Sequence, residues 1–223
     1  MKPNDIPENY KVIKPWGSEY TIYKNSTTST KLLKIEQNKS TSLHCHPQKK
    51  TGFILISGKV DINLGFYNTK KLGSVSRIMI RPGLFHSTKN LNEQTATVLE
   101  IETPIDKDDL VRFKDEYGRE NKPYEDKKSM VKLNGDEPIF KDPELNKNET
   151  YIIEGIAVKI NKTNSIDILR NSRKDSIFAI LEGGLISRNE KYVLSPGDIV
   201  GMDTIEKLTE VFKISKSITY LNI

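Results

Sequence analysis

The chain contains little cysteine, histidine or tryptophan: one Cys, three His and one Trp among 223 residues. A single thiol, Cys45, cannot form a disulfide within the chain, which indicates a reducing compartment. The first ten residues, MKPNDIPENY, lack the apolar core of a signal peptide, and no apolar run approaches the ~20 residues of a membrane-spanning helix. We therefore expect a cytoplasmic protein with no membrane partner.

Charged residues are abundant and mixed in sign. The 35 basic and 30 acidic residues give a net charge of +5 and are spread along the whole chain without a long basic run. Lysine is interleaved with Asn and Glu rather than with aromatic residues, so nucleic acid is not an expected partner. Small anions such as sugar phosphates stay among the candidate ligands.

The first hundred residues predict many short strands, because runs rich in Ile, Val, Tyr and Thr are bounded by Gly, Pro, Asn and Ser. This pattern is typical of a β-sandwich or barrel. The expected strands are Glu19–Tyr23, Lys31–Glu36, Phe53–Ser57, Lys59–Leu64, Arg77–Arg81 and Thr97–Thr103. One helix is expected after them, Asp106–Glu116, capped by Asp106 and packed on the β-domain through Leu110, Val111 and Phe113.

A polar, Pro-rich stretch divides the chain. It predicts a domain over residues 1–125, a linker over 126–150 and a second domain over 151–223. The second half is also expected to be β, with strands at Tyr151–Ile160, Ser176–Glu182, Leu185–Ser187 and Ser217–Ile223.

All three histidines fall in two short segments. Ser42–Pro47 contains His44 and His46 in an H-x-H pattern, and Arg81–His86 ends on the third histidine. On a strand, H-x-H places both imidazoles on one face, about 7 Å apart at the backbone, and a Pro-Gly turn can deliver His86 from a neighbouring strand. The pattern predicts a divalent-metal site of His44, His46 and His86, with a polar pocket that binds no ion as the alternative.

Both segments resemble the motifs of the cupin superfamily, H-x-H followed by a Glu and a Gly, then P-x-G-x-x-H with a trailing Asn, here Asn90. The resemblance implies an all-β double-stranded β-helix, or jelly roll. The glutamate ligand of the superfamily corresponds to Thr51, and a hydroxyl is a poor ligand for a divalent ion. The expected site therefore holds Zn, Mn, Fe or Ni on three histidines, unless Gln48 or a carboxylate from elsewhere provides a fourth ligand.

The two halves also share their turn residues, which predicts two tandem cupin-like repeats. Phe53–Gly58 has the layout of Phe178–Gly183, and Pro82-Gly83 has a counterpart in Pro196-Gly197. The places of the histidines and Thr51 are taken in the second half by Leu169, Asn171, Ser176 and Val200. We expect this degenerate repeat to bind no metal and either to cover the first module or to form a subunit contact, for instance in a homodimer.

A narrower resemblance covers most of residues 10–125. Val12–Gly17, Ser42-Leu43 and Lys107–Arg119 are similar to the type II mannose-6-phosphate isomerases, whose module also forms the C-terminal part of bifunctional mannose-1-phosphate guanylyltransferases. In that family the metal strand reads Q-x-H-x-x-R-x-E-H-W. Here His44 stands at the Gln of this motif, His46 at the first His and Lys49 at the Arg. Thr51 stands at the Glu, Gly52 at the second His and Phe53 at the Trp, so much of the site chemistry differs.

The resemblance implies a metal-dependent isomerase or epimerase whose substrate is a phosphorylated or nucleotide-linked sugar. Such a reaction needs an electrophile at the carbonyl, a base, and cations for the phosphate. The candidate cations are Lys49, Lys50, Arg81, Arg112 and Arg119. The resemblance singles out Arg112 and Arg119, and Lys50 is expected to be a surface charge. Asp109 and Arg112 can also pair with each other, three apart on the expected helix.

Glu100 and Glu102 are the candidate bases, because they alternate around Ile101 and share one face of their strand. If that face points inward, one of them can also be the missing ligand. If it points outward, both are solvated surface residues.

Two other classes of function stay open. A three-histidine Fe(II) oxygenase is compatible with the loss of the glutamate at Thr51, and a non-catalytic sugar-binding or regulatory protein is compatible with the changed site. Metal content separates the three: iron favours the oxygenase, zinc or manganese the isomerase, and no metal the binding protein.

Overall fold

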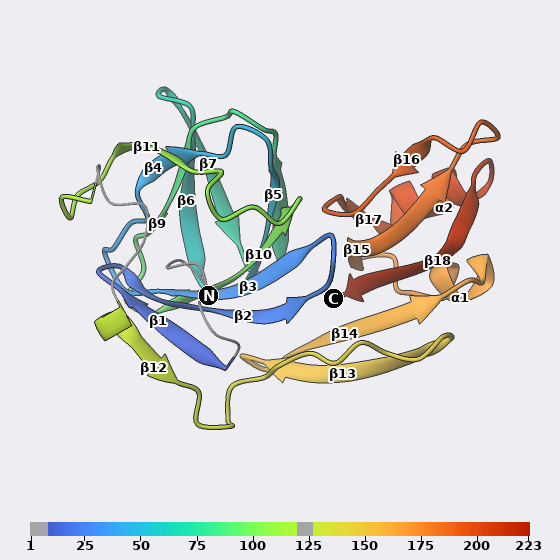
Figure 1. Ribbon diagram of the computed structural model, residues 1–223, viewed down its shortest axis with the longest axis horizontal. Coiled ribbons are helices and arrows are strands. Elements are labelled where there is room, and N and C mark those ends of the chain that lie inside the picture. Colours follow the sequence, from blue (N-terminus) through green and yellow to red (C-terminus); the bar gives the residue numbers. More distant parts are fainter. Residues whose placement is uncertain (1–8, 120–126) are drawn as a thin grey trace.

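The computed structural model describes residues 9–119 and 127–223, which form two β-modules side by side (Figure 1). The first module runs from blue to green in this view and the second from yellow to red. The boundary expected at residue 125 lies outside the described residues. Within them, no helix is long and apolar enough to cross a bilayer.

The first module is a jelly roll of two antiparallel sheets, so the predicted all-β class and double-stranded β-helix are confirmed. The larger sheet has the order β12 (Met130–Lys132), β1 (Tyr10–Lys14), β2 (Gly17–Lys24), β3 (Ser29–Ile35), β10 (Ala96–Thr103), β5 (Lys50–Ser57) and β8 (Ser76–Ile80). The smaller sheet has the order β11 (Val111–Lys114), β4 (Leu43–Cys45), β9 (His86–Asn90), β6 (Lys59–Leu64) and β7 (Asn68–Gly73).

Successive side chains along the strands of the larger sheet point to opposite faces and so contribute to two hydrophobic cores. On β5, Phe53 and Leu55 point between the two sheets, whereas Ile54 and Ile56 point towards the second module. The core between the sheets is formed by Trp16, Leu33, Ile35, Phe53, Leu55, Val60, Ile62, Ile80, Ala96 and Val98. Side chains in step with Val98 on β10 therefore also point into the jelly roll, and this decides where the acidic pair lies.

The second module is built on a single six-stranded sheet. Its order is β13 (Lys147–Ile153), β14 (Ile156–Thr163), β18 (Lys213–Asn222), β15 (Ile177–Ile186) and β16 (Tyr192–Leu194), with β17 (Ile199–Gly201) beside β15. One face packs on the first module, and the other is covered by α1 (Ile166–Arg170) and α2 (Met202–Thr209). In this second repeat, α1 and α2 take the place of the second sheet of a complete jelly roll, so the repeat is degenerate.

Equivalent turns in the two modules have the same form. Around Pro82-Gly83 the amide of Leu84 donates to the carbonyl of Arg81 at 3.3 Å, and around Pro196-Gly197 the amide of Asp198 donates to the carbonyl of Ser195 at 3.0 Å. Gly58 and Gly183, which end the matching strand segments, have φ values of +90° and +65°. L-residues with side chains rarely adopt these values, so the shared glycines preserve a shared turn.

Two predictions of local structure are wrong. Residues 106–116 contain no helix: Val111–Lys114 form β11, which pairs with β4, and Val111 and Phe113 are 48% and 59% exposed. The Asp106 carboxylate does accept a backbone amide, but that of Asp108, so it closes a local turn and caps no helix.

The second wrong prediction is the single strand over Tyr151–Ile160. This segment is split between β13 and β14 by a turn at Glu154-Gly155, where both residues have positive φ. The stretch expected as a linker, residues 126–150, contains a 3-10 turn, η1 (Lys127–Ser129), and β12, which extends the larger sheet beside β1.

Candidate metal centre

The three histidines converge inside the first module. His44 on β4 and His86 on β9 are direct Cα partners, and His46 follows β4 by one residue. Ring centroids lie 4.5 Å apart for His44–His86, 5.1 Å for His44–His46 and 5.6 Å for His46–His86. One ligand atom from each ring lies within 4.8 Å of the other two. Two segments far apart in sequence thus meet as the H-x-H and P-G-x-x-H patterns predict.

Each imidazole is oriented by a backbone carbonyl. The Nδ1 atoms lie 2.8 Å from Ser42 O for His44, 2.5 Å from Asp109 O for His46 and 3.0 Å from Leu84 O for His86. Because a carbonyl only accepts hydrogen bonds, each Nδ1 carries the proton and each Nε2 keeps a lone pair. Metal-binding histidines are commonly fixed by such a bond.

The histidines are prepared to act as neutral ligands. Burial lowers the pKa of His86 to about 4 and also lowers the pKa values of His44 and His46. His86 is 1% exposed, and its Nε2 has no hydrogen-bond partner. An orphaned buried lone pair is unfavourable unless something positive meets it, and three converging neutral imidazoles suit a divalent ion. The residues present therefore fit the expected metal.

Glu100 and Glu102 both point into the jelly roll and are 6% and 4% exposed. Lys31 on β3 is the Cα partner of Glu100, and its Nζ lies 2.7 Å from Glu102 Oε2 and 3.8 Å from Glu100 Oε2. The other oxygen of Glu102 lies 3.2 Å from Lys49 Nζ and 3.6 Å from His46 Nε2. A second group of possible metal ligands is thus His46 with Glu100 and Glu102.

The two glutamates have opposite acidities. Burial, with the charge of Glu102 adding to it, raises the pKa of Glu100 to about 7. Burial acts in the same direction on Glu102, but Lys31 and Lys49 outweigh it and lower the pKa of that carboxyl. Near neutral pH, Glu102 is therefore a fixed carboxylate, whereas Glu100 can take up or release a proton.

Asp109 positions the segment that carries His46 and Lys49. Its carboxylate accepts the backbone amides of Gln48 and Lys49 at 2.9–3.1 Å, while its carbonyl holds His46 Nδ1. The carboxylate thus binds the backbone beside the metal centre, and Gln48, one of the alternatives for a fourth ligand, contacts it through its backbone amide.

The two arginines predicted as anion ligands lie at the same pocket and also bind the protein. Arg112 donates to Ser42 Oγ at 3.1 Å and to the Arg119 carbonyl at 2.7 Å. Arg119 forms a two-bond pair with Asp115, at 2.8 and 3.0 Å. These bonds hold both guanidinium groups in fixed orientations beside the pocket.

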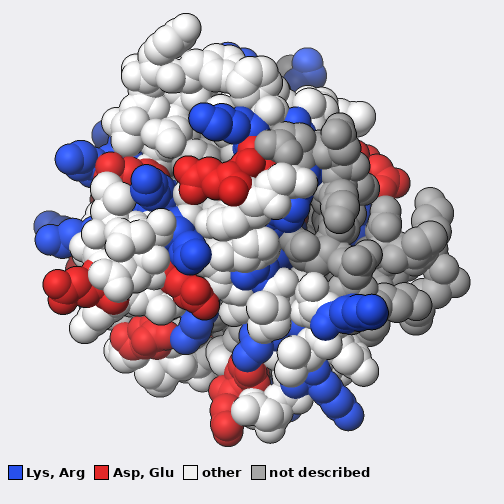
Figure 2. Space-filling model, turned by 90° about the vertical axis from the view of Figure 1, so that its left-hand side faces the viewer, with Lys and Arg blue, Asp and Glu red and all other residues white. Residues whose placement is uncertain are grey.

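One pocket contains most of these side chains and has a cavity of about 80 Å³. Its charged lining consists of five basic and three acidic residues: Lys14, Lys31, Lys49, Arg112, Arg119, Glu19, Glu100 and Glu102. The excess of basic groups favours an anionic ligand. On the face shown in Figure 2, by contrast, Lys and Arg lie among Asp and Glu outside the grey region.

Sequence reasoning missed Lys14, Glu19, Lys31, Asp109 and Asp115 as parts of the site. Lys31 carried the best available signal, since it alternates in step with Leu33 and Ile35, which point into the core between the sheets. Cys45, in contrast, is buried as expected. Among the described residues, both groups able to hold a metal lie in the first module. The second-repeat counterparts Leu169 and Val200 pack in an apolar core.

Comparison with known proteins agrees with this description. A family model described as "Mannose-6-phosphate isomerase C-terminal" matches residues 3–115. The chain is 27% identical over 111 residues to the xanthan biosynthesis protein XanB of Xanthomonas campestris, covering 49% of this chain and 24% of that protein. It is 24% identical over 110 residues to the mannose-1-phosphate guanylyltransferase ManC of Salmonella typhimurium, covering 48% and 23%. The chain thus matches about a quarter of the length of these relatives.

Among solved structures, a conserved Klebsiella pneumoniae protein with a double-stranded beta-helix domain is similar to this chain. It has 14% sequence identity and a TM-score of 0.40, with 43% of this chain and 82% of that chain covered.

Proposed function

Since the chain belongs to the mannose-6-phosphate isomerase C-terminal family, as the match over residues 3–115 shows, we propose that its first module is a metal-dependent site that isomerises or epimerises a phosphorylated or nucleotide-linked sugar. The observation that carries the proposal is the meeting of three neutral imidazoles, of which His86 has an unpartnered buried Nε2 and the other two line a pocket with excess basic side chains.

His44, His46 and His86 would hold the ion, for which Zn, Mn, Fe and Ni are the candidates. The ion would supply the electrophile that polarises the sugar carbonyl. Glu100 would move the proton between adjacent carbons at its carboxyl oxygen, because a group with a pKa of about 7 can both accept and return a proton near neutral pH.

Lys49, Arg112 and Arg119 would attract the phosphate. The two arginines are oriented by Ser42 and Asp115, so they would meet the anion at the pocket wall with little loss of side-chain freedom. The cavity of about 80 Å³ is smaller than the roughly 300–1,000 Å³ of typical small-molecule sites. We therefore propose that the reacting end of the sugar inserts while the rest stays at the mouth.

The test is proton exchange at the reacting carbon. The metal-loaded protein is incubated in D₂O with mannose 6-phosphate or fructose 6-phosphate, and deuterium at C2 is followed by NMR; mannose without phosphate is the control. Deuterium incorporation and interconversion in the phosphorylated sugars alone support the proposal. No exchange and no thermal stabilisation by any of a panel of sugar phosphates and nucleotide sugars would refute it.

An Fe(II) oxygenase is the second candidate, favoured by one observation. Thr51 stands where the family has a carboxylate ligand, and three-histidine iron sites leave positions open for oxygen and substrate. Elemental analysis of protein purified without added metal separates the two, since predominant iron favours the oxygenase and zinc or manganese the isomerase. A protein that binds no metal even in excess would instead be a sugar-binding or regulatory protein.

A further inference from the structure

Position 51 cannot provide the metal ligand that the resemblance assigns to it. Thr51 is 1% exposed, and its Oγ1 is buried without a hydrogen-bond partner. A carboxylate nevertheless lies beside it: Thr51 on β5 and Glu102 on β10 are Cα partners in the antiparallel ladder. Partners in a ladder project from the same face of the sheet, with Cβ atoms only ~5 Å apart.

From this relationship we infer that Glu102 completes the metal centre, so that the carboxylate ligand has moved across the ladder from β5 to β10. The inference rests on the metal centre of the proposed function and adds a ligand to it. One Glu102 oxygen, Oε1, lies 3.6 Å from Nε2 of His46, the histidine that belongs to both groups of possible metal ligands. The other, Oε2, is held by Lys31 at 2.7 Å.

The two Glu102 oxygens have different contacts, as the oxygens of a metal-binding carboxylate commonly do. A carboxylate that binds a metal through one oxygen is commonly fixed by a hydrogen bond at the other, and Lys31 supplies that bond. Lys49 Nζ lies 3.2 Å from Oε1, the same oxygen that lies near His46. Its ammonium group and an incoming metal ion would therefore compete for Oε1.

Glu100 provides the internal comparison. It lies two residues away on the same strand face, forms part of the same group with His46, and is similarly buried. Its nearest ion-pair distance, 3.8 Å from Lys31, is longer than that of Glu102. Its Cα partners are Lys31 and Phe53, whereas Glu102 faces the vacated ligand position itself.

Metal titration of the metal-free full chain tests the inference. Zn²⁺ affinity is measured by calorimetry and Co²⁺ coordination by visible absorption, for the native chain, Glu102→Gln, Glu100→Gln and Thr51→Glu/Glu102→Thr. We expect Glu102→Gln to weaken Zn²⁺ binding at least 100-fold and to change the Co²⁺ spectrum, with Glu100→Gln within about threefold of the native chain. The double variant, which returns the carboxylate to β5, should regain most of the affinity and the native-like spectrum.

Equal affinity in Glu102→Gln and the native chain would overturn the inference, as would a larger loss in Glu100→Gln. Circular dichroism of each variant verifies folding, and the double variant keeps the test decisive if Glu102→Gln does not fold. A native chain that binds neither ion would overturn the metal centre and this inference together. A native chain that binds metal through Glu102 but leaves sugars unchanged would overturn only the proposed reaction.

Discussion

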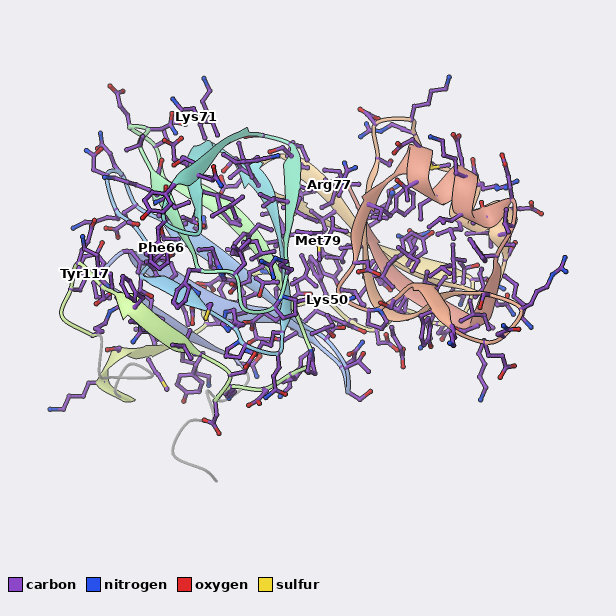
Figure 3. The ribbon with its side chains drawn as sticks, turned by 90° about the horizontal axis from the view of Figure 1, so that it is seen from above. Lys50, Phe66, Lys71, Arg77, Met79 and Tyr117 are labelled. Atoms are coloured by element: carbon purple, nitrogen blue, oxygen red, sulfur yellow. The ribbon has the colours of Figure 1, made fainter. Side chains whose placement is uncertain are left out.

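Gly52 on β5 and Ile199 on β17 are packed so closely that a Cβ on the glycine would lie 2.3 Å from Ile199 Cδ1 and 2.9 Å from its Cγ1. This contact joins the strand behind the metal centre to the second module. Lys50, two residues earlier, binds Ser195 Oγ at 3.0 Å and Asp198 Oδ1 at 2.8 Å in the same module, so it has a partner and is no plain surface charge. Figure 3 shows Lys50 and Met79 on the side of the first module that faces the second.

Gly52→Ala should lower the free energy of unfolding by about 1–3 kcal/mol, because the added methyl overpacks the interface against Ile199 and the Met79 sulfur. Gly73→Ala is the matched control, since a Cβ there meets nothing within 4 Å. It should stay within about 0.5 kcal/mol of the native chain. Guanidinium unfolding measures both, and an unchanged Gly52→Ala would mean that the modules are not packed at this point.

Thr51→Val should raise the stability of the metal-free protein by about 1 kcal/mol. The substitution keeps the shape of the side chain and removes a buried hydroxyl without a partner. Thr97→Val is the contrast: Thr97 is equally buried, but its hydroxyl donates to Glu154 at 3.3 Å, so its loss should destabilise by a similar amount. If urea unfolding shows that both substitutions change the free energy of unfolding in the same direction, the Thr51 hydroxyl is not buried without a partner.

Much of the site could be predicted because its residues repeat with the period of a strand. H-x-H and Glu-x-Glu each place two side chains on one face, whatever the rest of the fold does. Lys31 was missed for the opposite reason. Its role depends on β3 lying beside β10 with Lys31 opposite Glu100, and strand order and register are tertiary facts that one segment does not contain.

The helix predicted over Asp106–Glu116 failed for a related reason. A carboxylate that closes a turn and one that caps a helix look alike in sequence, and Val111 and Phe113 fit a strand spacing as well as a helical one. Pairing with β4, which carries His44, decides between them. The strand matters for the site, because Arg112 lies on it as the Cα partner of His44.

His46→Ala should abolish stoichiometric metal binding and leave the β fold intact, because it removes one of the three histidine ligands while the cores lie elsewhere. Metal at about 100 times its Kd should stabilise the native chain by about 2.7 kcal/mol and the variant not at all. Cys45→Ala, a change between the two H-x-H ligands, should keep the metal. Elemental analysis that finds full occupancy in His46→Ala would refute the assigned ligands.

Glu100 should make the stability of the metal-free protein depend on pH in a defined window. Its pKa is raised by burial from an ordinary 4.5 to about 7 in the folded state, so between these values the folded chain binds more protons than the unfolded chain. Stability from this group is therefore complete below about pH 4.5 and is lost as the pH rises through 7.

Glu100→Gln removes the ionisation and should flatten that slope. Since one pKa unit corresponds to about 1.36 kcal/mol, the variant should gain about 2–3 kcal/mol over the native chain at pH 8 relative to pH 5. Glu93→Gln, which changes an exposed carboxylate, should leave the profile parallel to the native one. Urea unfolding at half-unit pH steps measures the three curves. If Glu100→Gln and the native chain ran parallel from pH 5 to 8, Glu100 would titrate as an ordinary carboxyl and could not serve as the proton carrier of the pocket.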